Sequence, residues 1–181
     1  MIPRLETERL IMRGPEAGDF EAFAAMMARP EVARYIAPAP MTRAEAWRAL
    51  SSGIGHWVMR GYGAWTVMRK ADGAFVGRVG MINPEGWPGL EIGWTLDQPF
   101  WGMGYATEAA AAAMRYAFLT QPVDRLISNI DPENTASQAV AVRLGESKGE
   151  RSFLTVGGKD YPVDIWAIGR DEWRKRAAAL P

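Results

Sequence analysis

The most constraining feature of the sequence is an alternating strand that leads through a glycine turn into a helix of small residues. Leu90–Leu96 alternates large apolar residues with Glu91 and two small residues, which is the period of a β-strand. Gly102-Met103-Gly104 follows, and Tyr105–Leu119 is predicted to be a helix. The first N–H groups of a helix are unpaired and partly positive, and glycine lets an anion approach them. The segment predicts either a pyrophosphate site or a tight turn that needs glycine only for its backbone angles.

Two familiar phosphate motifs do not match this turn. The dinucleotide fingerprint requires Gly or Ala where Thr107 stands, and an acidic residue at the end of the next strand, whereas Asp124 precedes that strand. A P-loop requires Gly-Lys-Ser or Gly-Lys-Thr after its glycines, and neither tripeptide occurs here. An enzyme that uses another nucleotide stays a rival interpretation of this turn, and it predicts binding of NAD or ATP.

The remaining patterns predict an α+β chain in the order β-α-α-β-β-β-α-β-α-β-β, with a further helix at the C-terminus. Apolar alternation and turn residues predict strands at Arg9–Arg13, Ala64–Arg69, Phe75–Ile82, Leu126–Ile130, about Ser152–Val156 and Tyr161–Ile168, the last two joined at Gly157-Gly158. Helical periodicity and capping residues predict helices from Asp19 to Met27, from Thr42 towards Val58, at Thr135–Leu144 and at Asp171–Leu180, with a short turn over Glu31–Tyr35.

Composition indicates one ordinary globular domain over residues 1–181. The chain carries 21 Lys and Arg against 21 Asp and Glu, so its formal net charge is zero. Such a balance argues against a nucleic-acid binder that relies on a general basic field. The absence of cysteine excludes disulfides, thiolate metal sites and a cysteine acyl-enzyme, and it suits a cytoplasmic location.

Histidine content and hydropathy exclude further classes. His56 is the only histidine, so we expect no histidine-rich metal site and no metal cofactor. No apolar run approaches the roughly 18–20 residues of a membrane span, and the first residues lack the apolar region of a signal peptide. We therefore expect no membrane partner.

A second segment of interest follows the strand Leu126–Ile130. Asn134 and Ser137 are three residues apart, so both can face one side of the first turn of the helix Thr135–Leu144. Turn and cap chemistry explains Asp131–Thr135 equally well, and by itself it is the simpler reading.

Taken together, the motifs resemble the GNAT superfamily of acetyl-CoA-dependent N-acetyltransferases, in the branch of the ribosomal-protein N-terminal acetyltransferases. The resemblance runs in order along nearly the whole chain. Its motifs are Leu5–Arg13, Glu91–Trp94, Trp101–Ala109, Asn134 with Ser137, Arg143–Gly145 and Arg170–Trp173. It implies the GNAT, or acyl-CoA N-acyltransferase, fold: a mixed, mostly antiparallel sheet of seven strands flanked by helices, with two central strands that splay apart.

The resemblance also implies where acetyl-CoA binds. The pantetheine arm would lie between the splayed strands, the pyrophosphate would sit on the turn and helix start, and the second segment would touch the arm near the thioester. The implied coenzyme-binding residues are Trp94, Thr95, Leu96, Trp101, Gly102, Met103, Gly104, Tyr105, Ala106, Thr107, Asn134 and Ser137.

Catalytic roles are constrained by departures from the family pattern. Many members have Tyr as general acid where this chain has Ala141, so Ser137 is the remaining candidate for protonating the thiolate. Glu146 stands where many members have Phe. Glu91 is the candidate base, because it shares a strand face with small residues, although a solvated or salt-bridged carboxylate explains it equally. The other candidates near the amine are His56, Asp164 and Tyr161, for which packing or structural roles are simpler.

The acceptor stays open at this stage. Transfer of an acetyl group to a primary amine, on a protein N-terminus or a small molecule, fits the resemblance, and without cysteine direct attack in a ternary complex is the simplest scheme. The alternative is a non-catalytic acyl-CoA-binding domain of the same fold. A homodimer is compatible with the sequence.

Overall fold

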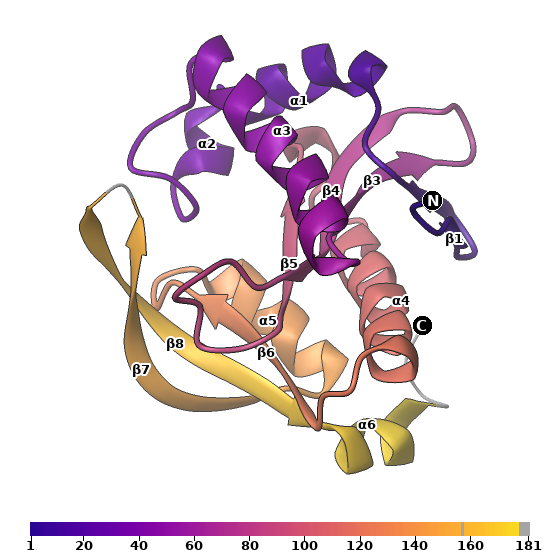
Figure 1. The fold of residues 1–181 in the computed structure, drawn as a ribbon, viewed down its shortest axis with the longest axis vertical. Helices are drawn as coiled ribbons and strands as arrows, with labels where there is room; N and C mark the ends of the chain where they lie inside the picture. Colours follow the sequence, from indigo (N-terminus) through magenta and orange to yellow (C-terminus); the bar gives the residue numbers. More distant parts are fainter. Residues whose placement is uncertain (157, 178–181) are drawn as a thin grey trace.

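The protein, seen in a computed structural model that describes residues 1–156 and 158–177, folds around one mixed sheet (Figure 1). The described strands are β1 Leu5–Glu6, β2 Leu10–Arg13, β3 Ala64–Arg69, β4 Phe75–Ile82, β5 Glu91–Leu96, β6 Arg125–Ile130, β7 Ser147–Val156 and β8 Lys159–Gly169. The described helices are α1 Phe20–Met27, α2 Pro30–Ala33, α3 Arg43–Arg60, α4 Tyr105–Thr120, α5 Thr135–Leu144 and α6 Arg170–Arg176, with 3₁₀ turns at Ala17–Asp19 and Gln98–Phe100.

The strand order is β1-β2-β3-β4-β5-β6-β8-β7, and among the described strands only the β5–β6 pair is parallel. A mixed, mostly antiparallel sheet is therefore confirmed. The described sheet has eight strands rather than seven, because the two-residue β1 pairs with β2 at the edge. The hairpin residue Gly157 and the predicted helix end at Leu180 lie outside the described residues.

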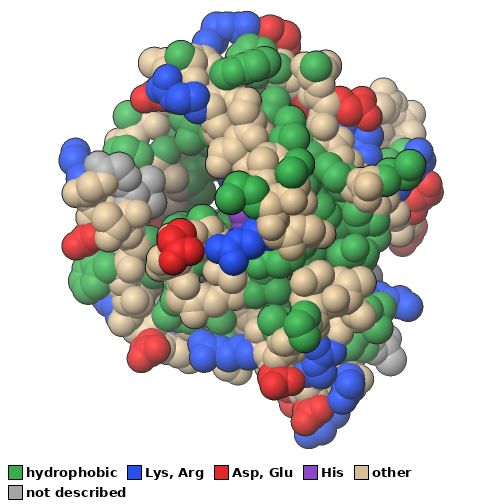
Figure 2. Space-filling view, in the orientation of Figure 1, with side chains coloured by type: hydrophobic (Ala, Val, Ile, Leu, Met, Phe, Trp, Pro, Cys, Tyr) green, Lys and Arg blue, Asp and Glu red, His purple; other side chains and the backbone are tan. Residues whose placement is uncertain are grey.

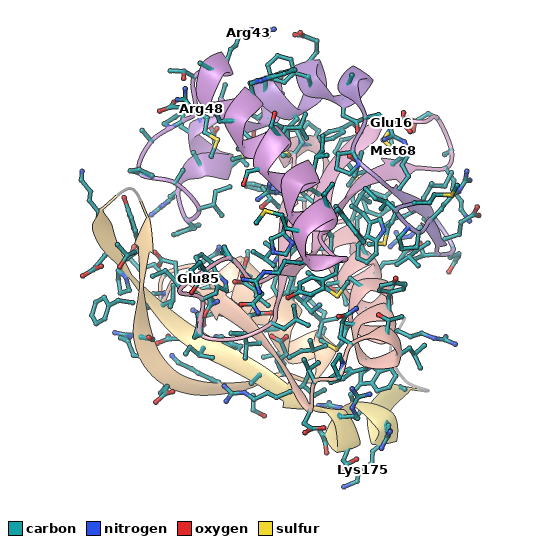
Figure 3. All side chains as sticks on the ribbon, viewed as in Figure 1. Glu16, Arg43, Arg48, Met68, Glu85 and Lys175 are labelled. Carbon is teal, nitrogen blue, oxygen red and sulfur yellow. The ribbon has the colours of Figure 1, made fainter. Side chains whose placement is uncertain are left out.

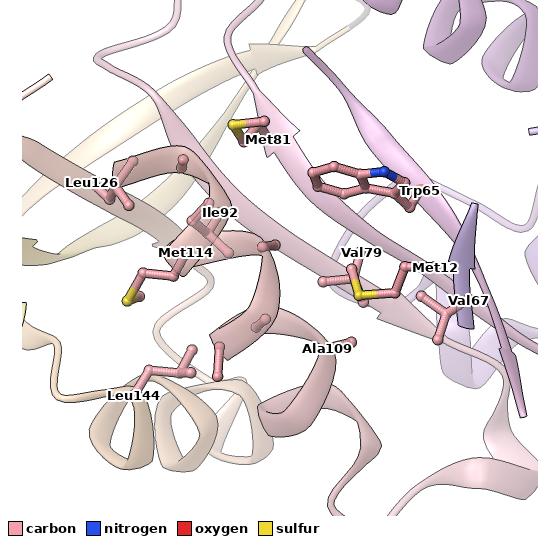
Figure 4. Packing of buried hydrophobic residues seen from close by; sticks show 14 of the residues in the cluster. Met12, Trp65, Val67, Val79, Met81, Ile92, Ala109, Met114, Leu126 and Leu144 are labelled. Carbon is pink, nitrogen blue, oxygen red and sulfur yellow. The ribbon is translucent and has the colours of Figure 1, made fainter. Parts of the chain in front are cut away.

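The main core lies between the sheet and α4 (Figure 4). Alternate residues of the central strands, such as Val79 and Ile92, point into it and are fully buried. On α4, Ala109 and its alanine neighbours are buried together with Met114. Because alanine side chains are short, the helix can lie close against β4 and β5, and this packing holds the start of α4 in a fixed place beside the sheet.

A second, smaller cluster joins α1, α2 and α3 over the opposite face of the sheet. The predicted capping box of α3 is confirmed, since Thr42 and Glu45 exchange the expected hydrogen bonds. The predicted cap at Asp19 is wrong. Its buried carboxylate instead accepts from the Arg13 guanidinium at 2.6 Å, the Thr66 hydroxyl at 2.8 Å and the Glu16 N–H at 2.9 Å. The charged guanidinium is a stronger donor than the N–H groups of the helix start.

The central strands splay apart after one ladder step. Glu91 pairs with Ile127, whose N–H donates to the Leu90 carbonyl, and no further β5–β6 pair follows within the described residues. The Ser128 hydroxyl then donates to the Ile92 carbonyl at 2.8 Å. Beyond this point the two strands separate, and the predicted splay is confirmed. None of the helices described here is long and apolar enough to cross a membrane.

Candidate functional site

A continuous cavity of about 2520 Å³ opens where β5 and β6 separate. It is lined by β5, the starts of α4 and α5, the α2 region with the loop after it, and part of β8. Figure 2 shows this face of the molecule hollowed between the helices at the top and the β7–β8 hairpin at the lower left. The volume exceeds that of a typical single-ligand pocket, so the cavity has room for two reactants side by side.

The start of α4 presents free backbone donors to this cavity. Gly102 and Gly104 both adopt left-handed backbone angles, with φ of 74° and 81°, so the turn itself requires glycine. The Glu108 N–H donates to the Gly104 carbonyl at 3.1 Å, which is the first hydrogen bond of this helix. The N–H groups from Gly102 to Thr107 have no partner among residues 1–156 and 158–177. Arg9 braces the turn, since it donates to the Met103 carbonyl at 2.9 Å and to the Glu108 carboxylate at 2.7 Å.

The first turn of α5 reaches across the gap to β5. The Asn134 side chain caps the helix by accepting from the Ser137 N–H at 3.1 Å, as the turn-and-cap interpretation expects. The Ser137 hydroxyl oxygen accepts from the Trp94 indole N–H at 3.2 Å. Because that oxygen is already an acceptor, its own hydrogen remains available to a group in the cavity.

The β5 edge that faces the gap carries unsatisfied backbone groups. Leu90 and Ile92 direct their carbonyls toward β6, and alternate residues of a strand share one edge, so Trp94 and Leu96 face the same way. The Trp101 indole already donates to the Leu96 carbonyl at 2.8 Å. Trp94 therefore offers the backbone groups that an extended ligand could pair with.

Glu91 lies under this edge as a buried, oriented carboxylate with 8% of its surface exposed. One oxygen, Oε2, accepts from the Trp87 indole at 2.5 Å and from the Asn129 amide at 2.7 Å. The other, Oε1, makes no hydrogen bond within the described part of the chain and lies above Gly93, where a Cβ would stand 3.6 Å away. Burial raises the pKa of Glu91, and the hydrogen bonds from Asn129 and Trp87 oppose that rise.

The other candidates for the amine side are placed differently. His56 has both ring nitrogens engaged, since Nδ1 donates to the Tyr62 carbonyl at 2.7 Å and Nε2 accepts from the Asn83 N–H at 3.1 Å. Asp164 is buried in ion pairs with Lys148 and Arg151. Of these three candidates only Tyr161 lines the cavity in the described part of the chain.

Two residues, Asn129 and Trp87, hold Glu91 in place, and neither was assigned that role from the sequence. Asn129, with Ser128 before it, interrupts the apolar residues of the strand Leu126–Ile130, which is a signal that could have indicated it. Trp87 lies in an irregular loop, and its contact with Glu91 depends on how that loop returns to β5.

Glu146, at the end of α5, is a second buried carboxyl near the gap. It is 4% exposed, and its Oε1 lies 2.9 Å from the Ser128 hydroxyl oxygen, while Oε2 has no partner among the described residues. Burial raises the pKa of Glu146 to about 8.

Comparison with known proteins assigns the family. Residues 9–146 match the family model described as an acetyltransferase (GNAT) domain. The chain belongs to the GNAT acetyltransferases. The matched span includes both splayed strands and the starts of α4 and α5, which line the cavity.

Individual relatives agree with this assignment. An uncharacterized N-acetyltransferase of Bacillus licheniformis, p20, is 30% identical over 93% of this chain and 97% of its own length. The Escherichia coli enzyme named [ribosomal protein uS5]-alanine N-acetyltransferase is 31% identical over 45% of this chain and 43% of its own. The crystal structure of an acetyltransferase from Agrobacterium tumefaciens superposes with a TM-score of 0.81, at 30% identity, over 93% of this chain and 95% of that one.

Proposed function

We propose that this protein is an acetyl-CoA-dependent N-acetyltransferase that moves the acetyl group to a primary amine by direct attack in a ternary complex. Membership of the GNAT acetyltransferases supports the reaction class. The observation that carries the proposal is Glu91, a buried carboxylate with one oxygen fixed by two donors and the other open to the cavity beside the splayed strands. We propose residues 1–181 as a single catalytic domain, and a cytoplasmic location fits the cysteine-free sequence.

The coenzyme half of the cavity is formed by three sets of groups in this proposal. The pantetheine arm pairs with the backbone of Trp94 at the free β5 edge. The pyrophosphate binds the unpaired N–H groups between Gly102 and Thr107, where the glycines let it approach. Asn134 and Ser137 lie at the thioester end. No metal takes part in the proposed reaction.

Glu91 removes the proton from the acceptor amine. The amine must be unprotonated to attack, and Glu91 Oε1 is the open oxygen of a carboxylate whose raised pKa makes it a stronger base than an exposed one. Ser137 passes a proton from its hydroxyl to the departing thiolate and takes one back from water in the cavity in the same step, so that no free alkoxide is left. Its oxygen meanwhile accepts from the Trp94 indole. Glu91 reaches the gap from β5, and Ser137 reaches it from the first turn of α5.

The test is a thiol-release assay with acetyl-CoA and a panel of amines, comparing wild type with Glu91→Gln. Gln can still accept from Trp87 and Asn129 but cannot take a proton, so we expect turnover at neutral pH to fall about 10²–10⁴-fold. The loss should shrink as pH approaches the pKa of the amine, near 8 for a protein N-terminus and near 10 for a lysine-type amine. An unchanged pH–rate profile would exclude Glu91 as the base.

A matched control is Glu85→Gln. Glu85 lies on the loop before β5 and is fully exposed (Figure 3), so its removal should leave turnover unchanged. The alternative function is a non-catalytic acyl-CoA-binding domain. That alternative predicts a thermal shift with acetyl-CoA, about 2.7 kcal/mol at 100 times the Kd, and no thiol release with any amine.

A further inference from the structure

Arg78 lies on the acceptor side of the sheet, on the same face as Glu91. In the β4–β5 register, Arg78 pairs with Thr95 and Ile82 pairs with Glu91. Directly paired residues of antiparallel strands point to the same face, and residues two apart share it. The neighbour Val79 points the other way, into the core against α4. The Arg78 side chain therefore leaves the sheet on the side of α1, not on the side of α4.

The guanidinium of Arg78 has no anionic or hydrogen-bonding partner within residues 1–156 and 158–177. It lies over the Phe23 ring, 5.7 Å from the centroid, and lines the same cavity as Glu91. Every other arginine in that part of the chain is either exposed to solvent or engaged in an ion pair or hydrogen bond. Among the described arginines, Arg78 alone is partly buried and unpaired.

An unpaired guanidinium in this position is costly for the free protein. Arginine stays charged at any relevant pH, and a buried charge without a partner loses hydration that nothing replaces. Burial lowers the pKa of Arg78, while the Glu91 carboxylate raises it without forming an ion pair. A carboxylate on a bound ligand would supply the missing bidentate partner.

We propose that Arg78 binds a carboxylate of the acceptor, so that the substrate is a small amine that also carries a carboxylate. This inference rests on the proposed function. The amine then lies at Glu91 Oε1 and the carboxylate at Arg78. Thr95, directly opposite Arg78 in the β4–β5 register, also lines the cavity, and the Ile82 side chain lies over Gly93. Such a zwitterion places each of its charges beside the opposite charge of the protein.

The coenzyme phosphates are not the partner in this proposal. The free N–H groups of α4 lie on the helix that packs against Val79, whereas Arg78 points to the opposite face. The same carboxylate chemistry could come from a free amino acid or from an acidic side chain near a peptide N-terminus. The proposal commits to the free amino acid, and the assay separates the two sources.

The experiment measures kcat/KM for L-amino acids and for their carboxamides, with acetyl-CoA saturating. The carboxamide has the same side chain, and its amine is more readily deprotonated, so more of it is present as the free amine that attacks. Any preference of the enzyme for the acid must therefore come from the carboxylate. We expect wild type to prefer the acid at least about tenfold. Arg78→Met should lower kcat/KM for the acid at least about tenfold and for the carboxamide less than about threefold, since only the acid loses its partner.

Controls separate recognition from folding. Arg78→Lys keeps the charge without the bidentate geometry and should recover part of the loss. Arg48→Met removes an exposed arginine of α3, labelled at the top of Figure 3, and should change nothing. Circular dichroism and the thermal shift with acetyl-CoA should match wild type for all three variants.

Each outcome decides a separate point. Equal use of acid and carboxamide by wild type, or an equal loss for both in Arg78→Met, overturns the assignment while leaving the acetyltransferase intact. A third outcome is that the enzyme acetylates peptides whose second residue is acidic, does not acetylate the matching amides, and does not use free amino acids. That outcome overturns the free amino acid as the source of the carboxylate. Acetyl-CoA binding without turnover on any member of the panel refutes the proposed function itself, and the assignment of Arg78 with it.

Discussion

Glu146→Gln should stabilise the protein, and the gain should grow with pH. The Ser128 hydroxyl has one hydrogen and two neighbours that could accept it, the Ile92 carbonyl at 2.8 Å and Glu146 Oε1 at 2.9 Å. If Ser128 donates to Ile92, Glu146 must be protonated to donate to Ser128. The buried carboxyl is therefore held in its neutral form, consistent with a pKa raised to about 8 by burial. Gln can make the same donation through its amide and never ionises.

The expected gain in the free energy of unfolding follows from the pKa shift of Glu146. The native pKa is about 8 against an ordinary value of 4.5, a difference of about 3.5 units, which at 1.36 kcal/mol per unit corresponds to about 4–5 kcal/mol. Between these two values the native state binds more protons than the unfolded state, so wild-type stability falls as pH rises. Glu146→Gln removes that fall. The variant should gain little at pH 4.5, about 3 kcal/mol at pH 7, and the full amount above pH 8.

Urea unfolding followed by circular dichroism at several pH values measures this difference. A gain of about 3 kcal/mol at pH 7 would raise the midpoint by about 1–3 M urea. Glu108→Gln is a control of opposite sign: although burial raises its pKa, hydrogen bonds from Thr7 and Arg9 hold the pKa of Glu108 below its ordinary value. That variant should lose stability at neutral pH and approach wild type in acid. A stability difference for Glu146→Gln that does not change between pH 5 and 8 would refute the reasoning.

Two further predictions concern the coenzyme half of the cavity. Gly102→Asp places a negative charge in open space at the predicted phosphate site, and Gly102→Asn tolerates the same left-handed backbone without the charge. In isothermal titration, the Gly102→Asp variant should bind acetyl-CoA at least about tenfold more weakly than the Gly102→Asn variant. Equal affinities of the two variants would place the phosphates elsewhere. Ser137→Ala should lower kcat at least about tenfold with little change in acetyl-CoA affinity, whereas Thr135→Ala, exposed on the same turn, should not. Turnover of Ser137→Ala within a factor of two of wild type would assign thiolate protonation to water or another group.

Local signals in the sequence were enough to predict most of the elements. The alternation of Leu90–Leu96 and the capping box at Thr42 are properties of a few neighbouring residues, and both are confirmed. Gly145 ends α5 with a φ of 87°, as a glycine after a helical pattern predicts. The order of strand, glycine turn and helix was likewise sufficient to locate the turn at the start of α4.

Features set by tertiary contacts were not predictable in the same way. The start of β7 reads Ser-Lys-Gly-Glu-Arg, which has no apolar alternation, and it is a strand because Ser147 pairs with Ala167 of β8. The two residues of β1 are too few for any period. Asn129 reaches Glu91 across 38 positions of sequence, and only the parallel β5–β6 register brings the two together.

The position of the cavity follows from the single parallel pair in the sheet. Because β5 and β6 run the same way, the helices that follow them, α4 and α5, both begin at the same end of the gap. Their first turns therefore converge on it from two sides. The Ser128 hydroxyl donates to the Ile92 carbonyl, so this carbonyl already has a donor at the place where the next backbone N–H of β6 would donate in a continuous ladder. The first free backbone groups of β5 are consequently those of Trp94, whose own side chain holds Ser137 across the gap.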